Sequence, residues 1–315
     1  MRRMTMIKYQ HVDRIDSDNT DGLLDGTCHI YPKMDGSNMC AYLEDGKVCT
    51  MSRNRVIEVP EPFARFVEGN PRIGEFLRAF PGLRLYGEWM VPHTIRSYVG
   101  ETWNRWFVFD VTAEDKDAVY AYELDGKRRV LEVAGRMYIP YEEYEPILRS
   151  YGIDSIPPIA IVENPTMETL GRMADEDATF MMAEGSGEGI VVKRYDFVNR
   201  YGRTEWAKVI NSEYSRKRIV RCNRGEGTIE RDITDRYVTP DLVSKECAKI
   251  VEVTGTDSGI QGRLLSTVYH CLVTEFMWDA VKRFGSPTVD FKALRRECDI
   301  AVKEARPEIF GLRLV

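Results

Sequence analysis

The stretch "YPKMDGSN", residues 31–38, decides how the rest of the chain is interpreted, because it places Lys33 just before Asp35 and Gly36. Asp-Gly is a common turn dipeptide, so one interpretation is a polar β-turn. The other is a nucleophilic lysine held beside an aspartate. A match to K-x-D-G alone would arise by chance in roughly one chain of this length in twenty-five, so the choice depends on the remaining sequence.

Composition limits the class of protein. The chain has 315 residues, of which 43% are hydrophobic and 30% are charged, which is enough for one large domain and a smaller one. It has no run of about eighteen apolar residues and no apolar core near its N-terminus, so we expect no membrane span and no signal peptide. Seven cysteines without a C-x-x-C spacing favour reduced thiols over disulfides or a zinc cluster. We therefore expect a cytoplasmic monomer without a membrane partner.

The first two thirds of the chain predict a β-rich body. Residues 28–57 predict a hairpin that turns at the Asp-Gly of "EDGK", residues 44–47. Further strands are predicted at 83–91, 105–113, 188–196 and 205–212, and helices within 61–80 and at 141–152 and 166–177.

After about residue 239 the sequence pattern becomes typical of helices. Thr239 is a suitable N-cap and Pro240 fits the first helical position. Helical spacing of apolar residues continues through 259–285 and 288–307. These patterns predict two domains, residues 1–235 and residues 236–315.

Six segments follow one another in a recognisable order. They are "KMDGSN" (33–38), "SRNR" (52–55), "LYGEWM" (85–90), "FVFDV" (107–111), "EGIVVK" (188–193) and "WAKVINSEYSRK" (206–217). This ordered series resembles the covalent nucleotidyltransferase superfamily, which contains ATP-dependent DNA ligases, RNA ligases and mRNA capping enzymes. The resemblance implies an α+β fold, in which a nucleotidyltransferase domain of ATP-grasp-like antiparallel sheets is followed by a small all-α domain.

The resemblance implies that Lys33 forms a covalent bond to AMP. A lysine amine attacks phosphorus only when it is neutral, and an ordinary lysine pKa of about 10.4 makes that form rare near pH 7. Nearby cations and a divalent metal ion would disfavour the charged form. By resemblance, Lys208 grips the α-phosphate, and Glu188 binds the metal or orients Lys33. Hard oxygen ligands suit Mg²⁺ or Mn²⁺.

Other positions match the family's nucleotide site. By resemblance, Phe109 stacks on adenine and Glu88 hydrogen-bonds the ribose, although each could instead be an ordinary core ring or a solvated strand-end carboxylate. Arg53 is assigned to the phosphate and sugar face of the nucleotide or to the RNA end. Three further residues match the family pattern and are assigned by resemblance to the cofactor-binding site: Asp35, Asn38 and Asp110.

One position departs from the family pattern. The last motif of the family usually carries two lysines two positions apart, but here the second position is Ile210. We expect Lys193 or Arg194 to supply the missing charge, or transfer onto RNA to be altered. Lys193 is accordingly expected to be a second phosphate contact, with a solvated strand-end charge as the alternative.

The helical tail points to one branch of the superfamily. DNA ligases and capping enzymes continue with a β-rich OB domain, so a helical tail favours RNA ligases of the bacteriophage type, and the motif spacing is most similar to the nick-sealing RNA ligase 2 family. The segment 215–224 has five basic and no acidic residues. It is either a solvated linker or an RNA-phosphate contact, and we favour the contact.

The resemblance thus implies an ATP-dependent RNA ligase that joins RNA 3′-hydroxyl and 5′-phosphate ends through a lysyl-AMP and an adenylylated RNA intermediate. Its cofactors would be ATP and Mg²⁺ or Mn²⁺, and its partner RNA with nicked or broken ends. Two alternatives stay open: an ATP-dependent DNA ligase and a catalytically inactive RNA-binding relative.

Overall fold

The protein was examined as a computed structural model, which describes residues 9–10, 12–15, 17–53, 55–92, 95–211, 227–256 and 259–311. The chain divides into two compact units. The first comprises Met1–Met90 with Ser97–Ser212, and the second comprises Glu213–Val315 with the short segment Val91–Arg96. The predicted division after residue 235 falls inside helix α6 (Ile229–Tyr237), whereas the units change at residue 212.

The first unit contains a five-stranded sheet that carries Lys33. Its strands, in spatial order, are β1 (Asp13–Arg14), β13 (Ala207–Ile210), β12 (Gly189–Lys193), β2 (Thr27–Lys33) and β11 (Ala160–Glu163). All neighbours are antiparallel except β1 and β13, which run parallel. The predicted strands at 188–196 and 205–212 are therefore confirmed, with shorter bounds.

A second, six-stranded sheet lies in the same unit. Its strands, in spatial order, are β10 (Tyr138–Ile139), β7 (Trp106–Ala113), β6 (Leu83–Trp89), β3 (Ser37–Glu44), β4 (Lys47–Ser52) and β5 (Val56–Ile57). The predicted turn at 44–47 is confirmed, because Asp45 and Gly46 both have positive φ, 48° and 78°. Residues 28–57 are nevertheless not one hairpin, since β2 pairs in the other sheet with β11 and β12.

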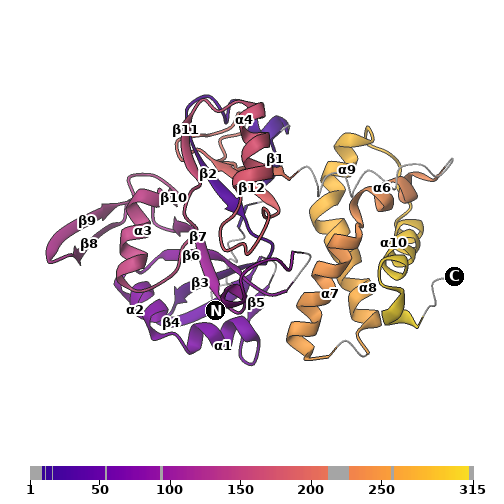
Figure 1. Ribbon diagram of the computed structural model, residues 1–315, viewed down its shortest axis with the longest axis horizontal. Helices are drawn as coiled ribbons and strands as arrows, with labels where there is room; N and C mark the ends of the chain where they lie inside the picture. Colours follow the sequence, from indigo (N-terminus) through magenta and orange to yellow (C-terminus); the bar gives the residue numbers. More distant parts are fainter. Residues whose placement is uncertain are drawn as a thin grey trace. The chain divides into compact units, whose positions relative to one another are not determined.

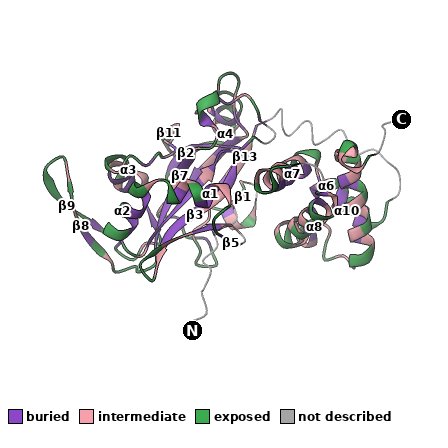
Figure 2. Ribbon diagram, turned by 90° about the horizontal axis from the view of Figure 1, so that it is seen from below, coloured by how far each residue is buried: buried purple, intermediate pink, exposed green. Residues whose placement is uncertain are grey.

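The two sheets enclose an aromatic core. It is formed by buried Tyr9, Cys40, Tyr42, Met51, Tyr86, Tyr138 and Trp206. The opposite face of the five-stranded sheet is covered by α4 (Met167–Arg172) and the following π-turn η3 (Met173–Asp177), with Ile30, Ile190 and Val192 in that core. Figure 2 shows the buried strands of both sheets in purple. The side chains of β2 and β12 therefore alternate between a helix-covered face and a face toward the second sheet.

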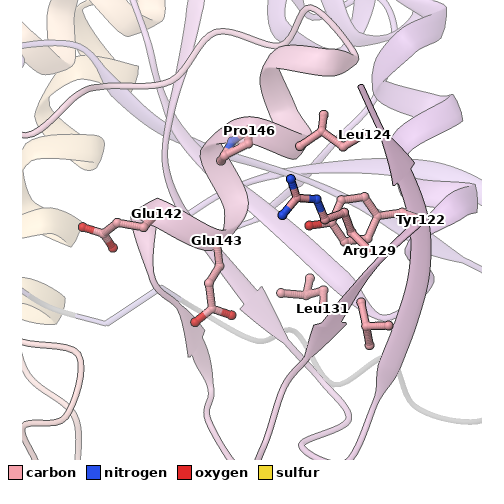
Figure 3. A pocket seen from close by; sticks show the side chains of 8 residues that line it. Tyr122, Leu124, Arg129, Leu131, Glu142, Glu143 and Pro146 are labelled. Carbon is pink, nitrogen blue, oxygen red and sulfur yellow. The ribbon is translucent and has the colours of Figure 1, made fainter. Parts of the chain in front are cut away.

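Helices and a projecting hairpin complete the unit. Its remaining elements are α1 (Pro62–Glu68), α2 (Pro71–Ala79), α3 (Tyr141–Ser150), β8 (Val119–Leu124), β9 (Lys127–Glu132) and the 3₁₀ turns η1 (Asp18–Thr20) and η2 (Gly100–Thr102). The β8–β9 hairpin extends away from the sheets (Figure 1). Together with α3 it lines an open cavity of about 270 Å³, and Tyr122, Arg129 and Glu143 are among the lining residues (Figure 3). No residue of this cavity is among the predicted site residues.

The second unit is helical. Its helical segments are α6, α7 (Pro240–Thr254), α8 (Gln261–Cys271), η4 (Leu272–Phe276), α9 (Met277–Arg283), α10 (Phe291–Ala305) and the 3₁₀ turn η5 (Pro307–Phe310). The predicted cap is confirmed, because the Thr239 side chain accepts a hydrogen bond from Leu242 N at 3.2 Å. Val243, Leu264 and Leu294 lie in its fully buried core. Across the described ranges of both units, no helix has the length and apolarity to cross a membrane.

The observed architecture is mixed α+β with antiparallel sheets, in agreement with the coarser part of the predicted fold class. The six cysteines described in the structure are all free thiols, as expected for this chain: Cys28, Cys40, Cys49, Cys247, Cys271 and Cys298.

Candidate active site

Lys33 is the last residue of β2, at the point where this strand pairs with the first residue of β12. The register places Gly189 opposite Lys33, so Glu188 immediately precedes the paired position. The Lys33 ammonium group donates a hydrogen bond to Glu188 Oε2. The two side chains are 20% and 27% exposed, so the pair is accessible from solvent. The backbone N–H of Asn211 donates a hydrogen bond to the Glu188 carbonyl at 3.0 Å, and this bond holds the backbone of Glu188 next to the end of β13.

Two glycines allow backbones to meet at this site. A Cβ on Gly36 would lie 2.7 Å from both Glu88 Cγ and the Trp89 carbonyl oxygen. A Cβ on Gly189 would lie 2.2 Å from the Val209 carbonyl oxygen, and its φ of +142° is in the region that favours glycine. Glycine is therefore needed at position 36 because β6 packs closely against it. A polar turn alone would not require this close contact.

The residues after Lys33 connect the two sheets. Asp35 is buried, and its backbone N–H donates to the Tyr98 hydroxyl at 2.9 Å. The Gly36 N–H donates to Glu88 Oε1 at 3.0 Å. Asn38 is opposite Glu88 in the β3–β6 ladder, and its buried Oδ1 has no hydrogen-bond partner among the described residues. The predicted residues Asp35, Asn38 and Glu88 are therefore neighbours beside the Lys33 strand end.

Cations gather around Lys208. Burial is the largest cause that lowers the pKa of Lys208, and the positive charges of Lys33, Arg53 and Arg14 act in the same direction, whereas Glu188 opposes them; together they bring this pKa to about 8. The register of the sheet sets Lys208 opposite Val191, and Val191 opposite Tyr31, two residues before Lys33, so the side chains of Lys208 and Lys33 lie on the same face. The structure thus places Lys33 and Lys208 on one face, with Glu188 paired to Lys33 and with the charge of Arg53 acting on Lys208.

Lys193 has surroundings that differ from the expected phosphate contact. Its side chain is 2% exposed, and its ammonium donates to Asp110 Oδ1 at 2.8 Å and to the Phe109 carbonyl at 2.6 Å. The Asp110 side chain is fully buried and also accepts a hydrogen bond from the Tyr9 hydroxyl. Burial lowers the pKa of Lys193 and raises that of Asp110, while each charge opposes the shift of the other. Lys193 is therefore committed to a buried ion pair between the sheets.

Phe109 lies at an irregularity in the β6–β7 ladder, where the register shifts between Tyr86 and Gly87. Its ring is partly buried and packs edge-on against Tyr9, with 5.1 Å between ring centroids. The Lys193 ammonium lies 5.5 Å from the centre of the Phe109 ring. The Asp110–Lys193 pair therefore fixes the position of the strand segment that carries the predicted adenine-stacking ring.

Ile210 occupies the position where a second lysine was expected, opposite Gly189 in the β12–β13 ladder. The expectation that Lys193 or Arg194 compensates for it needs revision. Lys193 is held by Asp110, and Arg194 donates to the backbone carbonyls of Gly22 and Asp25 on a different part of the unit. The predicted RNA-contacting segment 215–224 lies outside the described residues.

The donor set around the site suits a hard divalent cation that also binds substrate phosphates. In the described ranges, no group of three histidine, cysteine or acidic side chains gathers into a metal cluster. Mg²⁺ is commonly held by one or two carboxylates together with phosphate oxygens, so such a cluster is not required. The Glu188 carboxylate and the unpartnered Asn38 Oδ1 are the oxygen donors that fit this pattern.

Four residues of the site were not predicted from the sequence: Tyr9, Arg14, Tyr98 and Asn211. Tyr9 and Tyr98 act through single hydroxyl contacts to segments distant in sequence, and such contacts leave no periodic signal. Arg14 belongs to a two-residue strand, which is too short for an alternating pattern. Asn211 lies inside the last quoted segment, 206–217, three residues after Lys208, so its proximity to Lys208 in the sequence was the available signal.

Comparisons with known proteins place the chain in a family. The family model described as RNA ligase matches residues 27–210, which include every predicted site residue. A solved Naegleria gruberi RNA ligase variant with ATP and Mn has a TM-score of 0.51 and 20% identity, over 68% of this chain and 58% of the other. An apo variant of the same enzyme has a TM-score of 0.50, with the same identity and coverage.

The chain thus matches 58% of the length of these solved structures, and at 20% identity they show a shared fold. A sequence comparison with curated proteins finds no match. The family model covers more than half of the chain and spans the strands that hold Lys33, Glu188 and Lys208. The chain belongs to the RNA ligase family.

Proposed function

We propose that the protein is an ATP-dependent RNA ligase that joins a 3′-hydroxyl and a 5′-phosphate through covalent attachment of AMP to Lys33. The observation that carries the proposal is the Lys33–Glu188 pair at the β2–β12 strand ends, beside the cation Lys208, within the segment that matches the RNA ligase family. We assign these three residues the roles of nucleophile, proton acceptor and phosphate-binding cation, in that order.

In the first step, Lys33 Nζ attacks the α-phosphorus of ATP. A nitrogen–phosphorus bond forms, the bond from this phosphorus to the bridging oxygen breaks, and pyrophosphate leaves with the electron pair. Glu188 Oε2 already accepts a hydrogen bond from Lys33, so it can receive the proton that leaves Nζ. Lys208 stabilises the charge that develops on the α-phosphate oxygens.

The later steps use the same lysine as a leaving group. An oxygen of an RNA 5′-phosphate attacks the phosphorus of the adduct, the phosphorus–nitrogen bond breaks, and Lys33 departs as an amine whose nitrogen takes back the proton that Glu188 received in the first step. The 3′-hydroxyl then attacks the 5′-phosphorus, a phosphodiester forms, and AMP leaves. A divalent cation held at Glu188, with Asn38 as a further oxygen donor, would supply positive charge at the phosphate oxygens in these reactions.

The remaining predicted residues would hold the nucleoside. We propose that Phe109 stacks on adenine, that Glu88 accepts hydrogen bonds from the ribose hydroxyls, and that Arg53 contacts phosphate. The support is that Glu88 accepts a hydrogen bond from the Gly36 N–H beside the Lys33 strand end, and that the positive charge of Arg53 acts on Lys208. Lys193 and Asp110 would act on the nucleotide through the backbone position of Phe109.

We propose that the helical unit contributes to RNA binding. On α9, Trp278 is 69% exposed, and the Lys282 ammonium lies 5.8 Å from the centre of its ring. An exposed aromatic ring beside a cation suits an unpaired base and its phosphate, and stacking contributes about 1–3 kcal/mol per base. Arg295 and Arg296 fit this role less well, since both form ion pairs with carboxylates on α10.

The experiment that tests the function has two stages. The protein is incubated with α-labelled ATP and Mg²⁺ and run on a denaturing gel, where a labelled protein band is expected. Nicked duplexes with RNA or DNA strands are then offered, and sealing of the RNA nick is expected to be faster. A labelled protein that prefers the DNA nick would favour the DNA ligase alternative, and an unlabelled protein that binds RNA would favour the inactive relative.

The role of the helical unit is tested separately with Trp278→Ala. Loss of stacking is expected to weaken sealing of nicked RNA while adduct formation with ATP stays unchanged. Tyr201→Ala is the matched control, because Tyr201 is also an exposed aromatic residue, 60% exposed, but lies in the first unit. Equal sealing by the wild type and Trp278→Ala would remove the support for RNA contact on α9.

A further inference from the structure

Arg14 lies on the face of the five-stranded sheet that carries the candidate active site. Strand β1 pairs in parallel with β13, and the register sets Arg14 beside Lys208. Residues in register on neighbouring strands direct their side chains to the same face. Lys208 is in turn opposite Val191, and Val191 is opposite Tyr31, two residues before Lys33. Because alternate residues of one strand share a face, Arg14, Lys208 and Lys33 project from the same side.

Ile210 lies on this face as well, two residues after Lys208. A diagonal neighbour on an adjacent strand is about 7–8 Å away, within reach of a long side chain. Arg14 is exposed, and it forms no ion pair with any residue in the described part of the chain. Its guanidinium can therefore extend over the apolar surface of Ile210, toward the Lys33 strand end.

The electrostatic surroundings support this direction. Asp13, the neighbouring acid, alternates to the other face and accepts hydrogen bonds from Ser17 and Asn19, at 3.0 and 2.6 Å. The positive charge of Arg14 lowers the pKa of Lys208, as those of Lys33 and Arg53 do. Arg14, Lys208 and Lys33 thus share one face of the sheet, and Arg53 adds a further positive charge that acts on Lys208, with Glu188 as an opposing negative charge. Such a concentration of positive charge suits an anion with several charges.

We propose that Arg14 binds phosphate oxygens of ATP beyond the α-phosphate, and so provides from β1 the cation that Ile210 does not provide from β13. This inference rests on the proposed function and deepens it. Lys193 lies on β12, Lys208 lies on the neighbouring β13, and Arg14 lies on β1, one strand further away. Arg14 is therefore more distant than Lys208 from Lys193 and Phe109, where adenine is proposed to bind. A guanidinium also binds phosphate through two parallel hydrogen bonds, which an ammonium group in its place would not do.

The test compares the rate of Lys33 adduct formation as a function of ATP concentration in several variants. Arg14→Ala and Arg14→Gln are expected to lower the rate at low ATP by about 10- to 100-fold, as loss of one charge-assisted hydrogen bond would. Ile210→Lys added to Arg14→Ala is expected to restore part of the loss. The control is Arg78→Ala, because Arg78 is an exposed arginine on α2. Thermal unfolding of every variant is measured alongside.

A second arm offers nicked RNA that is already adenylylated, without ATP, to separate two sources of phosphate. Arg14→Ala is expected to seal this substrate at the wild-type rate, because it carries no triphosphate. A defect confined to this arm would assign Arg14 to RNA and overturn the proposal. Adduct formation equal to that of the wild type would overturn it as well, as would a defect matched by a lower unfolding temperature. A wild-type protein without any adduct would overturn the proposed function itself.

Discussion

The buried pair of Lys193 and Asp110 allows the sharpest test of how this site is supported. The change is Lys193→Met, which keeps the length of the side chain and removes its charge. The methionine would not donate to Asp110 Oδ1 and to the Phe109 carbonyl, and the fully buried Asp110 carboxylate would lose its ion-pair partner while it kept the hydrogen bond from the Tyr9 hydroxyl. We expect the loss to appear in the stability of the first unit.

The magnitude follows from burial. Removal of one partner of a buried ion pair costs about 3–5 kcal/mol, because the other charge stays uncompensated. For a unit of about 200 residues, each kcal/mol lowers the unfolding temperature by about 2–4 °C, so a decrease of about 6–20 °C is expected. The control is Arg55→Met, which breaks the pair with Glu61. Since the Arg55 side chain is 51% exposed, its loss is expected to cost less than about 1 kcal/mol.

The assay is thermal unfolding followed by tryptophan fluorescence, because buried Trp206 lies in the same cluster, with its ring centre 5.9 Å from the Lys193 ammonium. The double variant Asp110→Asn with Lys193→Met is expected to be less destabilised than the sum of the single changes, since neither then leaves a lone charge. Lys193→Met with wild-type stability and no ATP binding would refute the reasoning and restore Lys193 as a phosphate contact.

Three further predictions concern single side chains. Phe109→Leu is expected to raise the ATP concentration for half-maximal adduct formation by about 2- to 12-fold, as loss of 0.5–1.5 kcal/mol of stacking implies, and an unchanged value would exclude stacking. Because the pKa of Lys208 is about 8, part of the Lys208 population is neutral at pH 8, and the negative charge of bound ATP is expected to cause it to take up protons. Calorimetry in two buffers of different ionisation enthalpy detects this proton uptake, which Lys208→Met is expected to abolish. Burial and the negative charge of Asp13 raise the pKa of Glu205 to about 7, so folding favours the protonated form of Glu205. The free energy of unfolding is therefore expected to fall as pH rises from about 4.5 to 7, and Glu205→Gln is expected to flatten that pH dependence.

Strands that carry motifs could be predicted from local sequence. Apolar runs at 83–91 and 105–113 and the Asp-Gly turn at 44–47 are signals confined to a few neighbouring residues, and the structure confirms all three. The hairpin of β8 and β9 had a comparable signal, since Asp125-Gly126 follows alternating tyrosines, but it was missed. In contrast, the separation of β2 from β3 depends on long-range pairing, which no local pattern encodes.

The candidate site shows the same limit. The ordered motifs drew attention to Lys33 and Glu188, and their side chains do form a pair. The state of Lys193 could not be predicted, because a lysine at the end of a strand is usually solvated, and its burial here depends on Asp110 of the other sheet. Arg14 was unpredictable for a similar reason, since only the register of β1 with β13 brings it beside Lys208.

The most direct test of the central claim is to locate the AMP on the protein. After incubation with ATP and Mg²⁺, the wild type is digested and its peptides are analysed by mass spectrometry. We predict AMP on Lys33 alone and none on Lys33→Ala protein, which is expected to stay folded because the Lys33 side chain lies at the accessible end of β2. AMP on another residue of the wild type, or undiminished labelling of folded Lys33→Ala protein, would contradict the assignment of Lys33 as the nucleophile.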